Sequence, residues 1–142
     1  IVGFGVAARL AARERESEAA RLLSLRERLD GAIRGALEGV FLNGHAVDRL
    51  PGNLSLSFEG VDGERLVAEL RDVAVSSGSA CTTASGEPSH VLAALGVPPA
   101  LAKATLRFGL GRFTTAAEVD LAAGAVVAAV LRLRAEKASL SA

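Results

Sequence analysis

Leucine and isoleucine recur at steps of three and four through residues 22–37, which is the spacing of one apolar face of an α-helix. This face consists of Leu22, Leu25, Leu29, Ile33 and Leu37. The charged runs at 13–16 and 26–28 are interpreted as solvent-facing turns of the same helix, with ion pairs three or four residues apart. The pattern predicts one long helix over residues 1–38, weakened by glycines toward its end.

Apolar and polar residues alternate after this helix. In residues 53–58, Leu54, Leu56 and Phe58 share one face and serines occupy the other, which predicts a half-buried strand. Shorter apolar segments are predicted as strands at 40–42, 73–75 and 105–110.

Three more helices are predicted between and after these strands. Two are short, at 64–70 and 89–95, and Gly96 together with Pro98-Pro99 is expected to stop the second. Thr115 and Glu118 form a capping box that opens the last helix. Its apolar face is Val119, Ala122, Val126, Val130 and Leu133. Because the strands are few and short, the pattern predicts an α+β domain, a small sheet with helices packed on it.

Composition narrows the possible functions. The 142 residues suit one domain, and 16 basic residues balance 16 acidic ones, so no global charge favours nucleic acid or an anionic membrane. Trp and Tyr are absent, which removes the usual platform for stacking bases. The longest uncharged stretch near the end, 121–131, is far shorter than the roughly 20 residues of a membrane span. We expect a cytoplasmic protein without membrane or direct nucleic-acid contact.

The chain contains no methionine and begins at Ile1, so we expect it to be part of a longer product. Its single cysteine cannot form an intramolecular disulfide, which favours an intracellular protein.

Two motifs are set aside. Gly3-Phe4-Gly5 with Ala8 matches a dinucleotide-binding fingerprint, but only two residues precede it and no strand can feed the turn. Cys81, His45 and His90 have no zinc-ligand spacing, so we expect no metal site.

Cys81 lies in a small, polar segment, 77–86, that has no bulky apolar residue to anchor it. An unpaired cysteine is usually buried, so this setting favours an exposed, reactive thiol over a structural one, although both remain open. With four or five residues on each side, the thiol could move on the order of 15 Å, which suits a carrier of chemical groups. His90 is either a base for Cys81 or an ordinary surface histidine.

Arg107 lies between Leu106 and Phe108 in a predicted strand. Since alternate side chains of a strand point to opposite faces, Arg107 is expected on the polar face. A guanidinium on a rigid strand can bind a carboxylate through two parallel hydrogen bonds. The alternative is an exposed or ion-paired strand arginine.

Several segments together resemble the C-terminal part of pyridoxal-phosphate-dependent cysteine desulfurases of group I, the branch related to nitrogen fixation and iron–sulfur cluster assembly. They are Ser-Ser-Gly-Ser-Ala-Cys-Thr at 76–82, Glu-Pro-Ser-His-Val-Leu at 87–92, Leu-Arg-Phe-Gly-Leu-Gly-Arg-Phe-Thr-Thr at 106–115, Pro-Gly-Asn-Leu-Ser-Leu-Ser-Phe at 51–58 and the Ile-Val-Gly start.

The resemblance implies that residues 1–142 are the small C-terminal domain of a fold-type-I enzyme, with a mostly antiparallel sheet and a mobile loop at 76–88. It implies that Cys81 takes sulfur from L-cysteine as a persulfide, with release of L-alanine. Arg107 would bind the substrate carboxylate. The sulfur would pass to an acceptor or scaffold protein, and the full-length enzyme would be a homodimer.

The chain departs from that family because it carries no counterpart of the cofactor-binding residues. Neither Lys103 nor Lys137 lies in a motif that matches the cofactor lysine. We therefore expect a cofactor domain upstream, and we expect this chain alone neither to bind pyridoxal phosphate nor to desulfurate cysteine. Two other hypotheses are a non-enzymatic sulfur-carrier or partner-docking module, and a degenerate domain whose Cys81 is a redox-sensitive thiol. The sulfur could serve iron–sulfur clusters, tRNA thiolation or DNA phosphorothioation.

Overall fold

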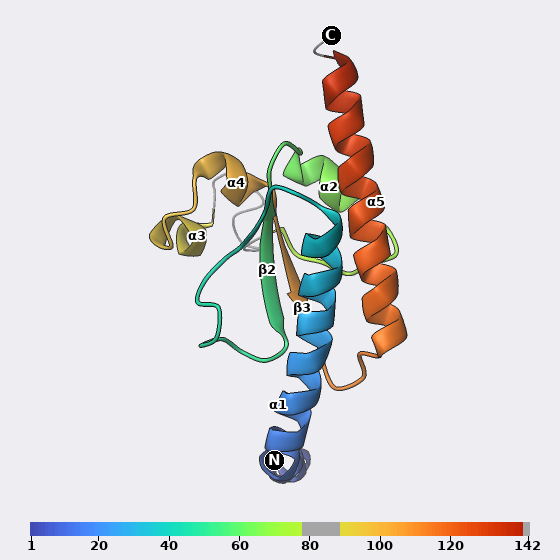
Figure 1. Ribbon diagram of the computed structural model, residues 1–142. Helices are drawn as coiled ribbons and strands as arrows, with labels where there is room; N and C mark the ends of the chain where they lie inside the picture. Colours follow the sequence, from blue (N-terminus) through green and yellow to red (C-terminus); the bar gives the residue numbers. More distant parts are fainter. Residues whose placement is uncertain (78–88, 141–142) are drawn as a thin grey trace.

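The computed structural model describes residues 1–77 and 89–140, which form two layers (Figure 1). One layer is a three-stranded antiparallel sheet, and the other is a pair of long helices that lie side by side across one face of that sheet. In chain order the elements are α1 (Val2–Ala36), β1 (Val40–Leu42), β2 (Asn53–Phe58), α2 (Gly63–Glu69), α3 (His90–Ala94), α4 (Pro99–Lys103), β3 (Thr105–Gly109) and α5 (Ala116–Leu140). The prediction of an α+β fold with a small antiparallel sheet is confirmed.

The hydrophobic core lies between the sheet and helices α1 and α5. β2 is the central strand, and Leu54, Leu56 and Phe58 point from it into the core with at most 1% exposure. Burying a side chain of this size contributes roughly 1.5–3 kcal/mol. The predicted helical faces pack against them: Leu25, Leu29, Ile33 and Leu37 from the α1 side, and Val119, Val126, Val130 and Leu133 from α5. On α5 the buried alanines are Ala123 and Ala129, and the predicted Ala122 is only partly buried.

The predicted strand at 73–75 is wrong. Among the described residues that follow α2, the pairing with the edge of β3 is an isolated bridge between Ser76 and Arg107. Val73 and Val75 are partly buried against the core. Their apolar side chains are therefore explained by this burial and not by pairing in a strand. The backbone bends there instead, and the Val73 amide donates to the carbonyl of Leu70 (3.2 Å).

Helix α4 was not expected, because Pro98-Pro99 was interpreted as a stop. Pro99 is the first residue of the helix, a position where the missing amide hydrogen costs nothing and the proline ring already sets a helical φ. Helix α4 packs against β2, and the Phe58 amide at the end of β2 donates a hydrogen bond to the carbonyl of Ala104, which follows α4 (2.9 Å).

The expected solvent-facing run at 26–28 is correct for Arg28 and wrong for Arg26. Arg28 is exposed and binds both oxygens of Asp120 on α5, at 2.6 and 2.7 Å. Arg26 is only 8% exposed, and its guanidinium reaches the carbonyl of Leu50 at 3.5 Å. Charge alone therefore mispredicted Arg26, because the segment after β1 covers that side of α1.

The turn that follows β3 is held by Arg21 of α1. The guanidinium donates to the carbonyl oxygens of Gly111 (3.0 Å), Arg112 (2.9 Å) and Thr114 (2.7 Å). Glu18 accepts two hydrogen bonds from the same guanidinium, and these bonds lower the pKa of the Glu18 carboxyl below its ordinary value. This contact fixes the end of β3 to the long helix.

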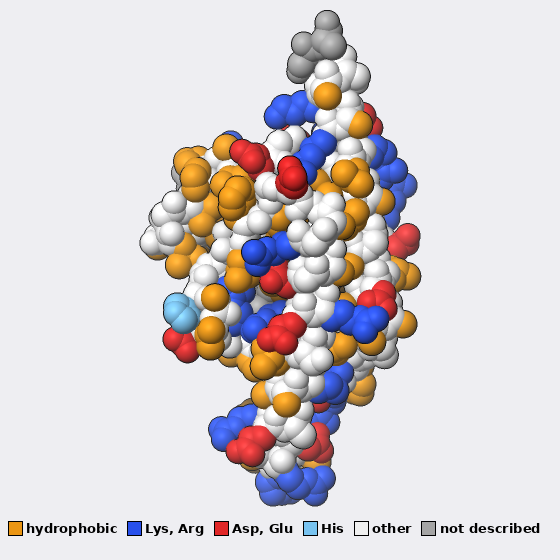
Figure 2. All heavy atoms as spheres, viewed as in Figure 1, with side chains coloured by type: hydrophobic (Ala, Val, Ile, Leu, Met, Phe, Trp, Pro, Cys, Tyr) orange, Lys and Arg blue, Asp and Glu red, His pale blue; other side chains and the backbone are white. Residues whose placement is uncertain are grey.

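Gly52 brings the start of β2 against the end of β3. The Leu110 amide donates to the Gly52 carbonyl (2.7 Å), and a Cβ at position 52 would collide with the Leu110 oxygen. Basic and acidic side chains are interspersed on the face shown in Figure 2, in agreement with the balanced composition. No helix in the described part of the chain has the length and hydropathy needed to cross a bilayer.

Candidate active site

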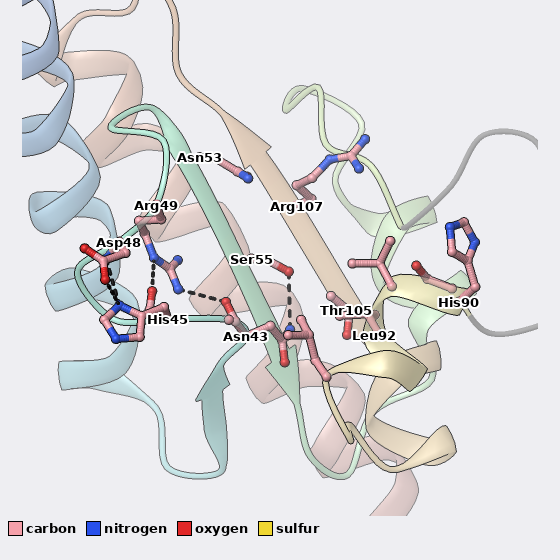
Figure 3. A pocket seen from close by; sticks show the side chains of 14 residues that line it. Asn43, His45, Asp48, Arg49, Asn53, Ser55, His90, Leu92, Thr105 and Arg107 are labelled. Carbon is pink, nitrogen blue, oxygen red and sulfur yellow. Dashed lines mark hydrogen bonds and ion pairs between the residues drawn. The ribbon is translucent and has the colours of Figure 1, made fainter.

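A pocket of about 500 Å³ opens on the sheet face that points away from α1 and α5 (Figure 3). β2 contributes Asn53 and Ser55 to its lining, and β3 contributes Thr105 and Arg107. The alternation that sends the leucines of β2 into the core places these polar side chains on the opposite face. The remaining walls come from the segment between β1 and β2 (Asn43, Gly44, His45, Asp48 and Arg49) and from α3 with the residues on either side of it (Ser89, His90, Val91, Leu92 and Leu95).

Arg107 stands on this polar face, as the alternation predicts. Leu106 is fully buried and Phe108 is 4% exposed, whereas Arg107 is exposed. Its backbone exchanges two hydrogen bonds with Ser76, at 2.7 and 3.2 Å, and its Nη2 atom donates to the Ser76 hydroxyl at 3.3 Å. The guanidinium makes no ion pair with the described residues, so it can offer donors to an anion in the pocket.

A chain of buried hydrogen bonds runs beneath the pocket. Asn43 Nδ2 lies 2.9 Å from the Ser57 hydroxyl, which is 2.7 Å from the Thr105 hydroxyl. The Thr105 hydroxyl donates to the carbonyl of Leu101 (2.9 Å), so it accepts the proton of Ser57. Ser57 in turn accepts a hydrogen bond from the Asn43 amide. Ser57 was expected on a solvent-facing side and is fully buried, because α4 covers this end of β2.

The wall between β1 and β2 is fixed by Arg49. Its guanidinium donates to the carbonyls of His45 (2.7 Å) and Asn43 (2.8 Å). Burial lowers the pKa of the Arg49 guanidinium below its ordinary value, and the nearby charge of Arg26 acts in the same direction. His45 Nδ1 accepts from the Asp48 amide (2.8 Å), which leaves Nε2 as the hydrogen-bearing nitrogen of the neutral ring.

The predicted site residues are only partly placed. Arg107 and His90 line the same pocket, and His90 is exposed on the first turn of α3. Cys81 lies outside the described residues, so its role and its pairing with His90 stay predictions. Within the described ranges, no three histidine, cysteine or carboxylate side chains are grouped as metal ligands.

The sequence did not single out several residues that lie in the pocket or next to Arg107, among them Ser55 and Asn43 of the pocket lining and Ser76, which is bonded to Arg107. Ser55 was visible as part of the alternation in β2, which was the available signal for its face. Asn43 had only the signature of a turn, and Ser76 had only its place in the serine-rich segment. The positions of Ser55 and Ser76 beside Arg107 depend on pairing between segments that are distant in the sequence.

The described pocket does not fit pyridoxal phosphate by itself. That cofactor is held by a lysine through a Schiff base, and the sequence contains two lysines, Lys103 and Lys137. Neither lines the pocket with Arg107: Lys103 ends α4, and Lys137 lines a separate hollow at the C-terminal end of α5. Binding of the cofactor would therefore require residues from outside this chain.

A comparison with protein families decides the wider assignment. The model of the class-V aminotransferases matches residues 1–121. The chain belongs to the class-V aminotransferase family. The resemblance noted from its segments is thereby confirmed at the level of the family, together with the similarity to cysteine desulfurases.

Several relatives of this chain are named as cysteine desulfurases. The chain is 54% identical over 134 residues to the cysteine desulfurase IscS of Anaeromyxobacter sp. (strain Fw109-5), with 94% of this chain and 33% of that protein covered. It is 53% identical over 134 residues to the IscS of Pseudomonas aeruginosa (strain LESB58), and 52% identical over 134 residues to the mitochondrial cysteine desulfurase of Arabidopsis thaliana. These alignments cover 94% of this chain and 33% and 30% of the two relatives. The chain thus spans about a third of the length of the relatives it matches.

Solved structures give the same fold. A NifS-like protein superposes with a TM-score of 0.72 at 25% identity, covering 87% of this chain and 31% of the other. The NifS-like protein of Rickettsia africae ESF-5 superposes with a TM-score of 0.71 over 92% of this chain and 33% of its own length. At 23% identity the second match supports the fold alone.

Proposed function

We propose that this chain supplies the sulfur-accepting thiol and the carboxylate-binding arginine of a cysteine desulfurase. The observation that carries the proposal is the position of Arg107. It stands in a pocket whose border includes Ser89, and it is hydrogen-bonded to Ser76. These serines flank the segment that carries Cys81, so the described chain stops next to Arg107 on one side of that cysteine and resumes at the border of the same pocket on the other.

The proposed chemistry is a sulfur transfer without net oxidation. The thiolate of Cys81 attacks the sulfur of L-cysteine, a sulfur–sulfur bond forms, and the carbon–sulfur bond of the substrate breaks. The products are a persulfide on Cys81 and L-alanine, whose carbon has taken up the electron pair and a proton. Arg107 binds the substrate carboxylate through two parallel hydrogen bonds and thereby orients the substrate sulfur.

The rest of the enzyme is assigned to residues outside these 142. The family generally depends on pyridoxal phosphate, and the described pocket holds no lysine for it. We propose that the chain is the smaller, C-terminal domain of the enzyme and that the cofactor is bound by a larger domain. The persulfide would then pass to an acceptor or scaffold protein from a homodimeric enzyme.

A chimera tests this proposal. The chain replaces the 134 residues that it matches in the Pseudomonas aeruginosa cysteine desulfurase. We expect the chimera to release alanine from L-cysteine and to gain 32 Da on the peptide that contains Cys81. A Cys81→Ser chimera that retains the cofactor absorbance is the matched control and should form no persulfide. Normal turnover by that control, or a cofactor-loaded chimera without turnover, would refute the proposal.

A second experiment distinguishes a part of an enzyme from a simple sulfur carrier. The carrier function is worth testing because this chain covers 33% of the length of the Anaeromyxobacter relative. The 142-residue chain is incubated with a persulfide donor and analysed by mass spectrometry. Sulfur on Cys81 in this chain, combined with an inactive chimera, would favour the carrier function. Reversible oxidation of Cys81 without sulfur uptake in either protein would favour a redox-sensitive thiol.

A further inference from the structure

Arg107 lies in the middle of a row of three residues that crosses the edge of the sheet. Ser55 of β2 is its direct partner on one side, and Ser76 is its partner on the other. In antiparallel pairing, directly opposed residues send their side chains to the same face. The side chains of Ser55, Arg107 and Ser76 therefore all project from the face that carries the pocket.

The two neighbours are not equivalent. The backbone N–H and C=O of Arg107 both form hydrogen bonds with Ser76, so these two groups point away from β2. The Ser55 carbonyl likewise accepts from Asn43 on the β1 side (2.9 Å). Ser55 and Arg107 thus form a pair without mutual backbone bonds, and Ser76 is the partner that is tied to Arg107 through its backbone.

The Ser76 side chain adds a third contact, because its hydroxyl accepts a hydrogen bond from Arg107 Nη2 at 3.3 Å. An exposed arginine has several rotatable bonds, and a carboxylate site requires one orientation of the planar guanidinium. A bond to Nη2 restricts that orientation and leaves the other N–H groups for a ligand. Among the described residues, Ser76 is the one whose side chain hydrogen-bonds this guanidinium.

We propose that Ser76 is a positioning residue of the carboxylate site, holding the Arg107 guanidinium in the orientation that binds the α-carboxylate of an amino acid. This inference rests on the proposed function of Arg107. Ser76 does not touch the substrate in this arrangement. It acts on substrate binding through Arg107. Ser76 lies directly before the segment that carries Cys81.

The test is a kinetic comparison in the cofactor-loaded chimera. Ser76→Ala keeps the backbone bridge and removes the hydroxyl, so KM for L-cysteine should rise about threefold with kcat nearly unchanged, the size expected of one exposed charge-assisted hydrogen bond. Ser76→Thr retains a hydroxyl and should restore KM. Ser77→Ala changes the adjacent exposed residue and is the matched control, with no change expected.

A second readout uses the 142-residue chain without cofactor. The ¹⁵N resonance of the Arg107 Nε–H group is followed while L-alanine is added, and Ser76→Ala should weaken the apparent affinity by the same factor of about three. An unchanged KM and affinity in Ser76→Ala, or a failure of Ser76→Thr to restore them, would overturn the positioning role. Arg107→Lys separates the two ideas: if it leaves KM unaltered, the carboxylate role of Arg107 itself is wrong.

Discussion

Replacement of Ser57 by alanine offers the sharpest test of how the floor of the pocket is held. The Ser57 hydroxyl is fully buried, donates to Thr105 (2.7 Å) and accepts from Asn43 (2.9 Å). Ser57→Ala removes both hydrogen bonds and leaves almost no cavity. At a net value of about 1 kcal/mol for each buried hydrogen bond, the free energy of unfolding should fall by about 2 kcal/mol.

Thr105→Val should cost less, although it removes a hydroxyl from the same chain of bonds. Without Thr105 as acceptor, the Ser57 proton can turn to Asn43 Oδ1, which lies at 3.2 Å. The Leu101 carbonyl still accepts from the Ala104 amide (3.1 Å), so no acceptor is left unpaired. One net hydrogen bond is lost, and we expect a decrease of about 1 kcal/mol.

Urea unfolding of the 142-residue chain, followed by circular dichroism, measures this difference. With a slope of about 2 kcal/mol per molar urea, the midpoints should fall by about 1 M for Ser57→Ala and about 0.5 M for Thr105→Val. Ser55→Ala is the matched control on the same strand, since Ser55 is only partly buried and the hydrogen bond that its hydroxyl accepts from Asn43 Nδ2 is long, at 3.3 Å. A Thr105→Val chain as unstable as Ser57→Ala would refute the assigned direction of the hydrogen bonds.

Two further predictions concern the stability of the fold outside the pocket. Gly63→Ala should lower the free energy of unfolding by more than about 2 kcal/mol, because the added Cβ would collide with the Lys103 carbonyl. Gly124→Ala is the control and should not destabilise the chain, because a Cβ at that position meets no atom within 4 Å. The midpoints of urea unfolding measure both effects. Hydrogen bonds from Arg28 lower the pKa of the Asp120 carboxyl, so this contact stabilises the fold above the unfolded pKa and is lost as the pH falls from about 5 toward 3. Asp120→Asn should therefore flatten the loss of stability with acidification, and an equally steep pH profile would contradict the contribution of this pair.

The sheet face that Arg107 occupies could be predicted from the sequence, and the residue beside it could not. Leu106 and Phe108 mark the buried face of β3, which leaves Arg107 on the polar side by alternation alone. Ser76 is 31 positions away, and nothing local to it predicts a bridge to Arg107. Cys81 was singled out by the character of its segment and by the family resemblance, and its role stays a prediction.

Local chemistry determined most of the secondary structure by itself. The leucine spacing determined the face of α1, the alternation determined the buried side of β2, and the capping box of Thr115 and Glu118 determined the start of α5, with the Glu118 carboxylate accepting from the Thr115 amide at 2.8 Å. Each of these signals involves residues a few positions apart, and their geometry follows from the period of one helix or strand.

Tertiary structure decided which polar groups are covered. Ser57 is buried because α4 packs over its end of β2, and Arg26 is buried because the segment after β1 crosses α1. The pocket exists because β2, β3, α3 and the β1–β2 segment meet on one face of the sheet. Burial of a polar side chain and the approach of distant segments depend on the packing of the whole chain, so no local period in the sequence specifies them.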